Sequence, residues 1–465
     1  MTAEGWFALG EGALCWLAIR RHRRFGGAEF PLIPGLLLAH LMLFGLPAAL
    51  FRDQFLGLGS SPGILGSIWV TETLSPEALR GAALMVFVGM LALVAGYELP
   101  LAAMLLAPMP SIRITWRRNP VPPALLLMGC GLAAAVIEKG PHPLNLEGIL
   151  GAVSFVGLWA MGALWLLNWR GLLGIQVRAA TWVMTAALMG LEIVQSALWR
   201  PLIDAVLLLA IYRRARGRTP WFAIALALPV FLSMAAAKVG FRMLLSEERL
   251  KTTGALEKLE IYRQSLELAY DNPAGLDLEE IVLTRMSEIQ LLGVVVQRSP
   301  RFIPYWRGAT YVNAAWSLVP RFLLPTKPTE NSGQDFPHRY DIIEPGNDHT
   351  SVNLATLIEM YANFGPAGVI VGMMLFGVAC RGLELLFVDA IVNDATYTLA
   401  APVLASLLLI EQPFYGAFGA FVQHTPILIL VLELCGICGF SLVPVATAAA
   451  TVSAERGMAH HGARG

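Results

Sequence analysis

Charged residues are scarce in this sequence. Asp, Glu, Lys and Arg make up 14% of its 465 residues, and 33 basic side chains balance 33 acidic ones. A chain without net charge has no general electrostatic attraction to nucleic acid. Its mean hydropathy of +0.62 also means more apolar surface than a water-soluble domain can bury. The composition therefore excludes a nucleic-acid-binding protein and an ordinary soluble enzyme.

Cysteine is rare, and the signatures of common enzyme families are missing. None of the five cysteines falls between residues 241 and 361. Cys435 and Cys438 have the C-x-x-C spacing of redox proteins but lie in an apolar segment, which favours buried thiols that behave as small apolar side chains. There is no Walker lysine loop, no G-x-G-x-x-G and no G-x-S-x-G. We expect no bound cofactor.

Apolar runs long enough to cross a bilayer are abundant, and a helical crossing takes about 20 residues. Because lipid offers the backbone no hydrogen-bonding partner, such runs are expected to be helices. The predicted fold is all-α, a polytopic membrane helix bundle with one large external, partly helical loop before the last three spans. The sequence predicts about eleven spans, at residues 6–19, 30–51, 81–107, 122–137, 148–168, 179–197, 200–212, 220–240, 363–388, 397–413 and 424–447.

Basic residues fall in alternate connections of this predicted bundle. Because cytoplasmic loops are enriched in Lys and Arg, we expect the N-terminus outside and the C-terminus inside. The basic connections are residues 20–24, residues 112–119, Arg170 with Arg178, and residues 213–218. The chain then divides into spans 1–8 (residues 1–240), an external loop (241–361), spans 9–11 (362–448) and a cytoplasmic tail (449–465).

The predicted external loop is the only external segment large enough to carry a site. Residues 277–297 read as an amphipathic helix, which either lies on the membrane surface or folds back over the bundle. Arg285 and Glu288 need not be buried in that helix. Its apolar face is predicted to hold Ile281, Met286, Ile289 and Leu292. Residues 330–350, ENSGQDFPHRYDIIEPGNDHT, are polar and irregular in an otherwise apolar chain.

A family resemblance lies in the segments around this polar stretch. Residues 316–328 read WSLVPRFLLPTKP, and residues 350–381 read TSVNLATLIEMYANFGPAGVIVGMMLFGVACR. The proline–arginine pair, the Lys-Pro and the Glu-x-x-x-Asn-Phe-Gly segment before a glycine-rich span resemble bacterial oligosaccharide repeat-unit polymerases. These are the O-antigen polymerase, or Wzy-type, proteins. The specific similarity covers roughly residues 280–385, and elsewhere it is one of topology.

The resemblance implies a glycosyltransferase at the outer face of the bacterial cytoplasmic (inner) membrane. Donor and acceptor would both be oligosaccharide repeat units linked to polyprenyl diphosphate. Membrane lipids, a flippase and a chain-length regulator protein are the other expected partners. Charge that builds on the departing diphosphate is best stabilised by arginine. Its guanidinium group is permanently charged and can donate two parallel hydrogen bonds to phosphate oxygens. The acceptor hydroxyl needs a nearby base.

Candidate substrate-binding residues are those that can present a cation or a hydrogen bond at the membrane boundary. Lys238 and Arg242 are four residues apart on the helix that leaves the eighth predicted span, and Arg321 carries the family-like motif. Snorkelling is the plain alternative for Lys238 and Arg242, and a solvated charge for Arg285 and Arg339. An idle charge is less expected at Arg321, which lies between two prolines. The candidates are Arg242, Arg285, Arg321, Arg339, Lys238 and Asn363.

Candidate catalytic bases are Glu359, His349 and His338. The two histidines bracket the polar stretch. Glu359 enters the ninth predicted span, where a carboxylate indicates function, although the dipole of its own helix also favours it there.

A metal ion is not expected at this site. Asp335, Asp341 and Asp348 could gather with the two histidines, but no spacing matches H-E-x-x-H, an EF-hand or D-x-D. We therefore expect metal-independent transfer.

Two other functions stay open. An O-antigen-ligase-like transferase would use the same donor and the same arginines with a different acceptor, and no residue separates it from a polymerase. A flippase or exporter of lipid-linked glycans would need polar residues through the middle of several spans, and most predicted spans are uniformly apolar.

Overall fold

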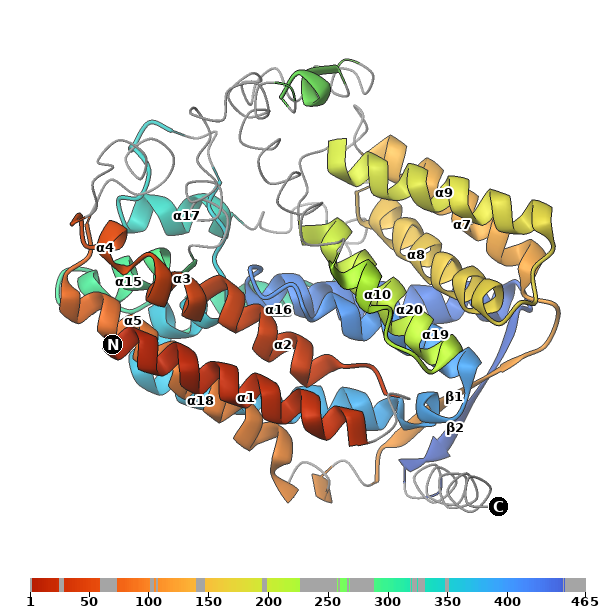
Figure 1. Ribbon diagram of the computed structural model, residues 1–465, viewed down its shortest axis with the longest axis horizontal. Helices are drawn as coiled ribbons and strands as arrows, with labels where there is room; N and C mark the ends of the chain where they lie inside the picture. The colour runs from red at the N-terminus through yellow and green to blue at the C-terminus, as the bar shows by residue number, and fades with distance from the viewer. Residues whose placement is uncertain are drawn as a thin grey trace.

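The computed structural model shows a predominantly helical protein (Figure 1). It describes residues 2–24, 29–58, 73–100, 104–105, 108–138, 147–194, 199–225, 257, 260–265, 267, 288–317, 319, 324, 331–347, 351–445 and 447. The all-α prediction is confirmed in its main feature. A two-stranded antiparallel sheet is an addition that the sequence did not predict.

The helices and strands follow one another in four groups. The first holds α1 (Ala3–Arg24), α2 (Leu32–His40), the π-helix η1 (Leu41–Gly45), α3 (Leu46–Leu50), α4 (Arg52–Phe55) and α5 (Pro76–Glu98). The second holds β1 (Pro110–Trp116), α7 (Val121–Glu138), α8 (Glu147–Trp169), α9 (Ile175–Val194) and α10 (Trp199–Arg216). The third holds α15 (Glu288–Arg298), the 3-10 helix η4 (Ala309–Tyr311), α16 (Val312–Ser317) and α17 (Ser332–Arg339). The last holds α18 (Thr356–Leu386), η5 (Val388–Ile391), α19 (Asp394–Ser406), α20 (Phe414–Leu434) and β2 (Cys438–Pro444).

Five helical segments among the described residues are long and apolar enough to cross a membrane, and they identify the chain as a membrane protein. They are Leu32–Leu50, Pro76–Glu98, Ile149–Trp169, Thr356–Leu386 and Phe414–Leu434. The predicted count of about eleven spans was therefore too high for the part of the chain that the structure describes. Short apolar runs were counted as full spans: the predicted spans 6–19 and 200–212 have 14 and 13 residues, and α19 has 13. Residues 226–240 of the predicted eighth span lie outside the described residues.

The helices α5 and α18 pack so closely that their backbones touch. A Cβ atom added at Gly96 would lie 2.0 Å from the carbonyl oxygen of Met374, and one added at Gly377 would lie 2.1 Å from that of Leu93. Lipid tails are as apolar as leucine, so helices in a membrane associate through such close contacts between small residues. Gly377 of the glycine-rich span and Gly96 of α5 thus serve helix packing.

Helix α18 is broken near its start. Gly365 has φ 64° and ψ −150°, and Pro366 follows it. Glycine takes this φ without steric cost, and proline supplies no N–H to continue the helix. Residues 366–386 then form a stretch of about 31 Å at 1.5 Å per residue, close to the hydrocarbon thickness of a bilayer. Residues 356–364 form a separate short helical piece at one end of it.

The last helix ends earlier than predicted, and the chain continues as a strand. Helix α20 stops at Leu434, and Gly436, with φ 62°, takes the left-handed conformation that commonly terminates helices. The strand β2 then pairs antiparallel with β1, with Phe440 opposite Ile114. Cys435 and Cys438 therefore lie at a helix-to-strand junction, and both are free thiols.

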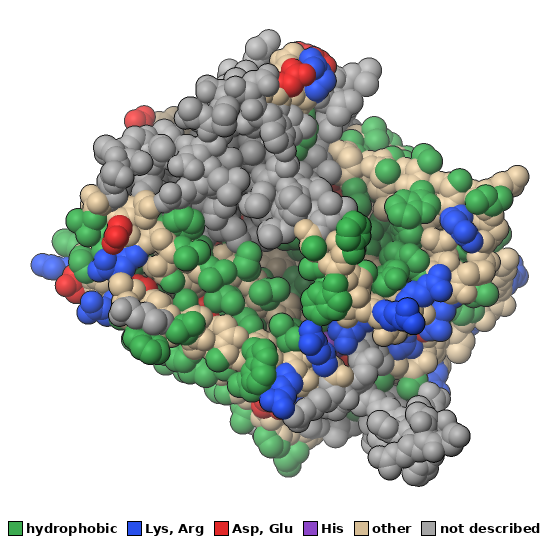
Figure 2. Space-filling model, viewed as in Figure 1, with side chains coloured by type: hydrophobic (Ala, Val, Ile, Leu, Met, Phe, Trp, Pro, Cys, Tyr) green, Lys and Arg blue, Asp and Glu red, His purple; other side chains and the backbone are tan. Residues whose placement is uncertain are grey.

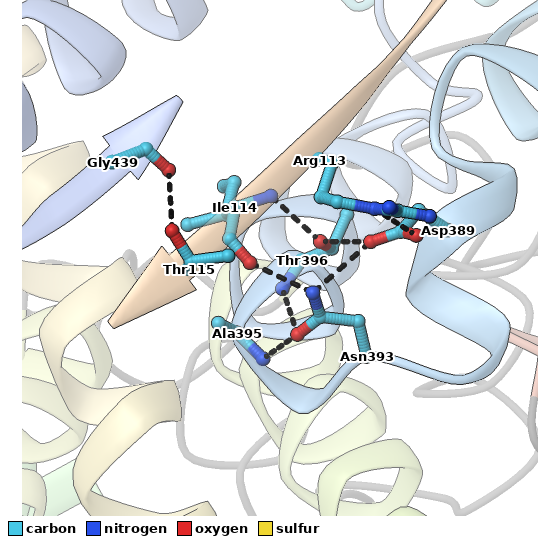
Figure 3. A network of polar contacts seen from close by, with 8 residues as sticks. All are labelled: Arg113, Ile114, Thr115, Asp389, Asn393, Ala395, Thr396 and Gly439. Carbon is cyan, nitrogen blue, oxygen red and sulfur yellow. Dashed lines mark hydrogen bonds and ion pairs between the residues drawn. The ribbon is translucent and has the colours of Figure 1, made fainter. Parts of the chain in front are cut away.

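The outer edge of β1 is hydrogen-bonded by side chains of η5 and α19 (Figure 3). The Ile114 N–H donates to Thr396 Oγ1 (3.0 Å), and the Ile114 carbonyl accepts from Asn393 Nδ2 (2.7 Å). Asp389 accepts from Thr396 (2.9 Å) and Asn393 (3.0 Å) and pairs with Arg113 (2.8 Å). Because an unpaired buried backbone group is costly, these contacts anchor the sheet to the helices.

Basic side chains gather at the end of the molecule that carries this sheet, which we call the basic end (residues 20–24, 112–119, 170–178 and 213–218). In Figure 2 part of this group forms a band of Lys and Arg side chains over the ends of α1 and α10. Ion pairs tie the four segments to neighbouring helices: Arg21–Glu98, Arg113–Asp389, Arg117–Glu433, Arg170–Asp394 and Arg214–Asp394. The other end, which carries α15 and α17, is called the loop end.

We predict that Gly377→Ala lowers the thermal stability of the purified protein, because the added methyl group meets a backbone carbonyl. Overpacking of this kind costs about 1–3 kcal/mol. The matched control is Gly190→Ala in α9, where an added Cβ meets nothing within 4 Å and helix propensity favours alanine. Thermal unfolding in detergent compares the two variants, and equal melting temperatures would contradict the close contact.

Candidate functional site

Helix α15 folds back over the bundle and packs against α5. Ile289 and Leu292 are fully buried there, as predicted, but every residue from Glu288 to Val295 is buried as well, so this part of the helix has no exposed polar face. The prediction that Glu288 need not be buried was wrong. Its side chain is buried at the start of α15, and this burial raises the pKa of its carboxyl group to about 8. Ile281, Arg285 and Met286 lie outside the described residues.

Residues 304–311, which we call the docked loop, lie against the short first piece of α18. The Trp306 N–H donates to the Ala362 carbonyl (3.0 Å), and the Arg307 N–H donates to the Asn363 carbonyl (3.1 Å). In an unbroken helix the Ala362 carbonyl would accept from the residue at position 366, but Pro366 has no N–H to offer. The helix break therefore frees a carbonyl that the docked loop uses.

The side chain of Asn363 fastens the same loop. Its Oδ1 accepts from the Gly308 N–H (2.8 Å), and its Nδ2 donates to Thr310 Oγ1 and to the Glu359 carbonyl, each at 2.8 Å. Asn363 is completely buried. Its amide is thus engaged with the protein on both sides, which is the geometry of a positioning residue.

Glu359 connects α18 to the start of α20. Its Oε2 accepts from the backbone N–H of Phe414 at 2.6 Å, and Phe414 is the first residue of α20. A carboxylate at this place satisfies an N–H that has no partner within its own helix and interacts favourably with the helix dipole. Glu359 also faces Tyr311, whose pKa is raised by burial and then by the charge of Glu359.

The two remaining residues of the Glu-x-x-x-Asn-Phe-Gly segment also contact the docked loop. Phe364 stacks on Tyr311, with ring centroids 6.3 Å apart and planes 12° apart. A Cβ at Gly365 would lie 2.5 Å from the hydroxyl oxygen of Tyr305, so a larger residue would displace the loop. All four residues that define the segment therefore serve one structural purpose, which is to join α18, the docked loop and α20.

Arg339, in the last turn of α17, lies over the docked loop. Its Nη2 donates to the Pro304 carbonyl at 2.7 Å, and its guanidinium lies 5.4 Å from the ring centroid of Trp306. Its Nε has no hydrogen-bond partner among the described residues, while the side chain is only partly buried. That Nε is itself buried, so what the site presents is the partly exposed end of a guanidinium held in one orientation.

Further aromatic rings lie beside the docked loop. Tyr340 lies edge-on to Trp306 at 6.1 Å and contacts Ser299 Oγ through its hydroxyl at 2.9 Å. Tyr305 lies edge-on to Tyr361 at 6.3 Å. Sequence reasoning did not assign these rings to the site. The available signal was the run of aromatic residues between positions 302 and 316.

The structure brings together three of the predicted site residues, Arg339, Glu359 and Asn363, through the docked loop. His338 precedes Arg339 in α17 and is partly buried. Five others lie outside the described residues: Lys238, Arg242, Arg285, Arg321 and His349. Asp341 pairs with Arg298 at 2.6 Å. No group of three or more His, Cys, Asp or Glu within the described part of the chain is placed to hold a metal ion.

One protein-family model, described as a domain of unknown function (DUF8712), matches residues 175–387. The matched range includes the docked loop, α17 and α18. No curated protein and no solved structure matches the chain.

We predict that Asn363→Ala loosens the docked loop, because the Gly308 N–H and Thr310 lose their partner. Leaving such a group unsatisfied costs about 1–3 kcal/mol. Thermal unfolding and trypsin cleavage at Arg307 measure the effect, with Asn331→Ala as the control, since Asn331 is exposed and its side chain makes no capping bond. Wild-type melting and cleavage in Asn363→Ala would show that the amide does not hold the loop.

Proposed function

We propose that this protein joins oligosaccharide repeat units carried on polyprenyl diphosphate, by glycosyl transfer at the outer face of the bacterial cytoplasmic membrane. One observation carries the proposal. The Glu-x-x-x-Asn-Phe-Gly segment, on which the resemblance to Wzy-type polymerases rests, joins α18 to a loop that holds a partly exposed arginine. We infer that the diphosphate of a lipid-linked substrate lies beside this arginine.

Arg339 would bind the diphosphate of the donor. The Pro304 carbonyl and the Trp306 ring hold its guanidinium in one orientation, so little reorganisation is needed as charge develops. A cation held in place before the reaction stabilises the transition state more than a mobile one does. Arg242, Arg285 and Arg321 stay candidates for further phosphate contacts, and Lys238 for a contact at head-group level.

In the proposed reaction the acceptor hydroxyl oxygen attacks the anomeric carbon of the donor sugar. The bond from that carbon to the diphosphate oxygen breaks, and the diphosphate leaves with the electron pair. The hydroxyl proton passes to a base. His338 is the described candidate because it lies beside Arg339, and His349 is the second. Glu359 is completely buried against the start of α20, so we assign it and Asn363 to positioning.

The arrangement of the basic segments supports the proposed orientation. All four lie at the basic end, where the rule of cytoplasmic Lys and Arg places the inside of the cell. The loop end then faces outward, with Arg339 at the level of the lipid head groups. The N-terminus would lie outside and the C-terminus inside.

Labelling in intact cells tests this orientation. We expect a cysteine at Gly346 to react with a membrane-impermeant thiol reagent and a cysteine at Arg218 to react only after the cells are opened. Both positions are exposed, and nothing lies within 4 Å of a Cβ at Gly346. The unmodified protein gives the background from its own five cysteines. Labelling of the Arg218 variant alone would reverse the orientation and place Arg339 in the cytoplasm.

Arg339 provides the test of the reaction. We predict that Arg339→Ala slows polymer formation roughly a hundred- to thousandfold, the usual effect of losing one donor to a developing anion. Arg339→Lys should recover only part of the activity, because lysine keeps the positive charge but lacks the paired N–H donors of the guanidinium group. The matched control is Arg301→Ala, which removes an exposed arginine that lies over Phe302 at 5.2 Å. Glycan ladders are measured in membranes supplied with a defined lipid-linked repeat unit.

The same assay separates the three candidate functions. A ladder of lengthened lipid-linked products supports a polymerase. Transfer of one glycan to a different acceptor would make the protein a ligase, and movement across the membrane without new bonds would make it a flippase. Normal ladders from Arg339→Ala at matched expression would remove Arg339 from the site.

A further inference from the structure

Two arginines at the basic end come together without a carboxylate partner among the described residues. Arg23, near the end of α1, and Arg213, in the last turn of α10, make no ion pair with a carboxylate among the described residues, whereas the arginines of the five pairs named above do. The two are also near each other. Arg23 lies over the ring of Trp221, which closely follows α10, at 5.5 Å from its centroid. Burial and then the charge of Arg23 lower the pKa of Arg213.

A histidine completes this cluster. His22 is nine-tenths buried, and its Nε2 has no hydrogen-bond partner among the described residues. Burial and the charge of Arg213 lower its pKa to about 4, so the imidazole is neutral at physiological pH and can present an N–H. Two like charges and an unused ring nitrogen in one place are unfavourable without an anion. The cluster has the composition of an anion site.

The surroundings of the cluster select the kind of anion. Trp221 and Phe222 are 61% and 82% exposed, and Trp16 is 56% exposed. The guanidinium of Arg20 lies over the Trp16 ring, 5.1 Å from its centroid. Exposed tryptophans beside arginines are typical of the interface between head groups and acyl chains. A ligand with both a phosphate and hydrocarbon tails matches cations and rings together, and guanidinium groups bind phosphate oxygens in pairs.

We propose that Arg23, Arg213 and His22 bind the phosphate of an anionic phospholipid in the membrane leaflet at the basic end. In Figures 1 and 2 the ends of α1 and α10 lie along one band of basic side chains. Helix α1 packs with α2 and α5, whereas α10 packs with α8 and α19. The lipid phosphate would therefore bridge two groups of helices. This site is separate from the glycosyl transfer at the loop end and does not depend on it.

The experiment compares thermal unfolding of the full-length protein in phosphatidylcholine nanodiscs with and without phosphatidylglycerol. We expect phosphatidylglycerol to raise the melting temperature of the unaltered protein, and Arg23→Gln and Arg213→Gln each to lose most of that rise. Arg178→Gln is the matched control. It removes the same charge at the same end, from an exposed side chain that bonds only the Leu173 carbonyl among the described residues, and should keep the rise.

An equal rise in all four proteins would overturn the proposal, because general surface charge would then explain it. If inorganic phosphate without phosphatidylglycerol gives the full rise in melting temperature, the cluster binds free phosphate and the proposed lipid site is wrong. Arg23 is exposed, so Arg23→Gln is expected to fold even if Arg213→Gln does not. Native mass spectrometry of that variant should then show less retained phosphatidylglycerol than the Arg178→Gln control, and equal retention would refute the site.

Discussion

The close contact between α5 and α18 is the constraint on which the rest of the structure depends. Helices in lipid gain little from burying apolar surface against each other, so they rely on small residues that let their backbones meet. The contact at Gly96 and Gly377 holds α18 in place. At the loop end α18 carries Glu359 and Asn363. At the basic end its Glu384 accepts a hydrogen bond from Tyr97 of α5, so one packed pair of helices connects both polar regions.

The break in α18 is what allows the loop end to form a site. An intact helix would use its own carbonyls, whereas Pro366 leaves the Ala362 carbonyl to Trp306. The docked loop then carries the Trp306 ring to the guanidinium of Arg339. A glycine and a proline inside an apolar segment thus determine where an arginine of a distant helix is held.

Local sequence features predicted part of this arrangement correctly. Ile289 and Leu292 are buried as helical periodicity predicts, although Gln290 and Leu291 between them are buried too. Glu288 was misjudged because its burial depends on the packing of α15 against other helices, which periodicity does not contain. The strands β1 and β2 were missed for a similar reason. Their partners are far apart in the chain, and the outer edge of β1 is satisfied by Asn393 and Thr396.

By itself the sequence determined that this is a helical membrane protein with its basic residues in a few connections, because lipid leaves the backbone few other structures than helices. It also indicated Glu359, Asn363 and Arg339 as residues of interest. Only the tertiary structure decided what each one does. Asn363 bonds Gly308, which lies 55 positions away, and Glu359 bonds Phe414 at the same separation. A side chain's role depends on which partners reach it, and those partners are set by how the helices pack.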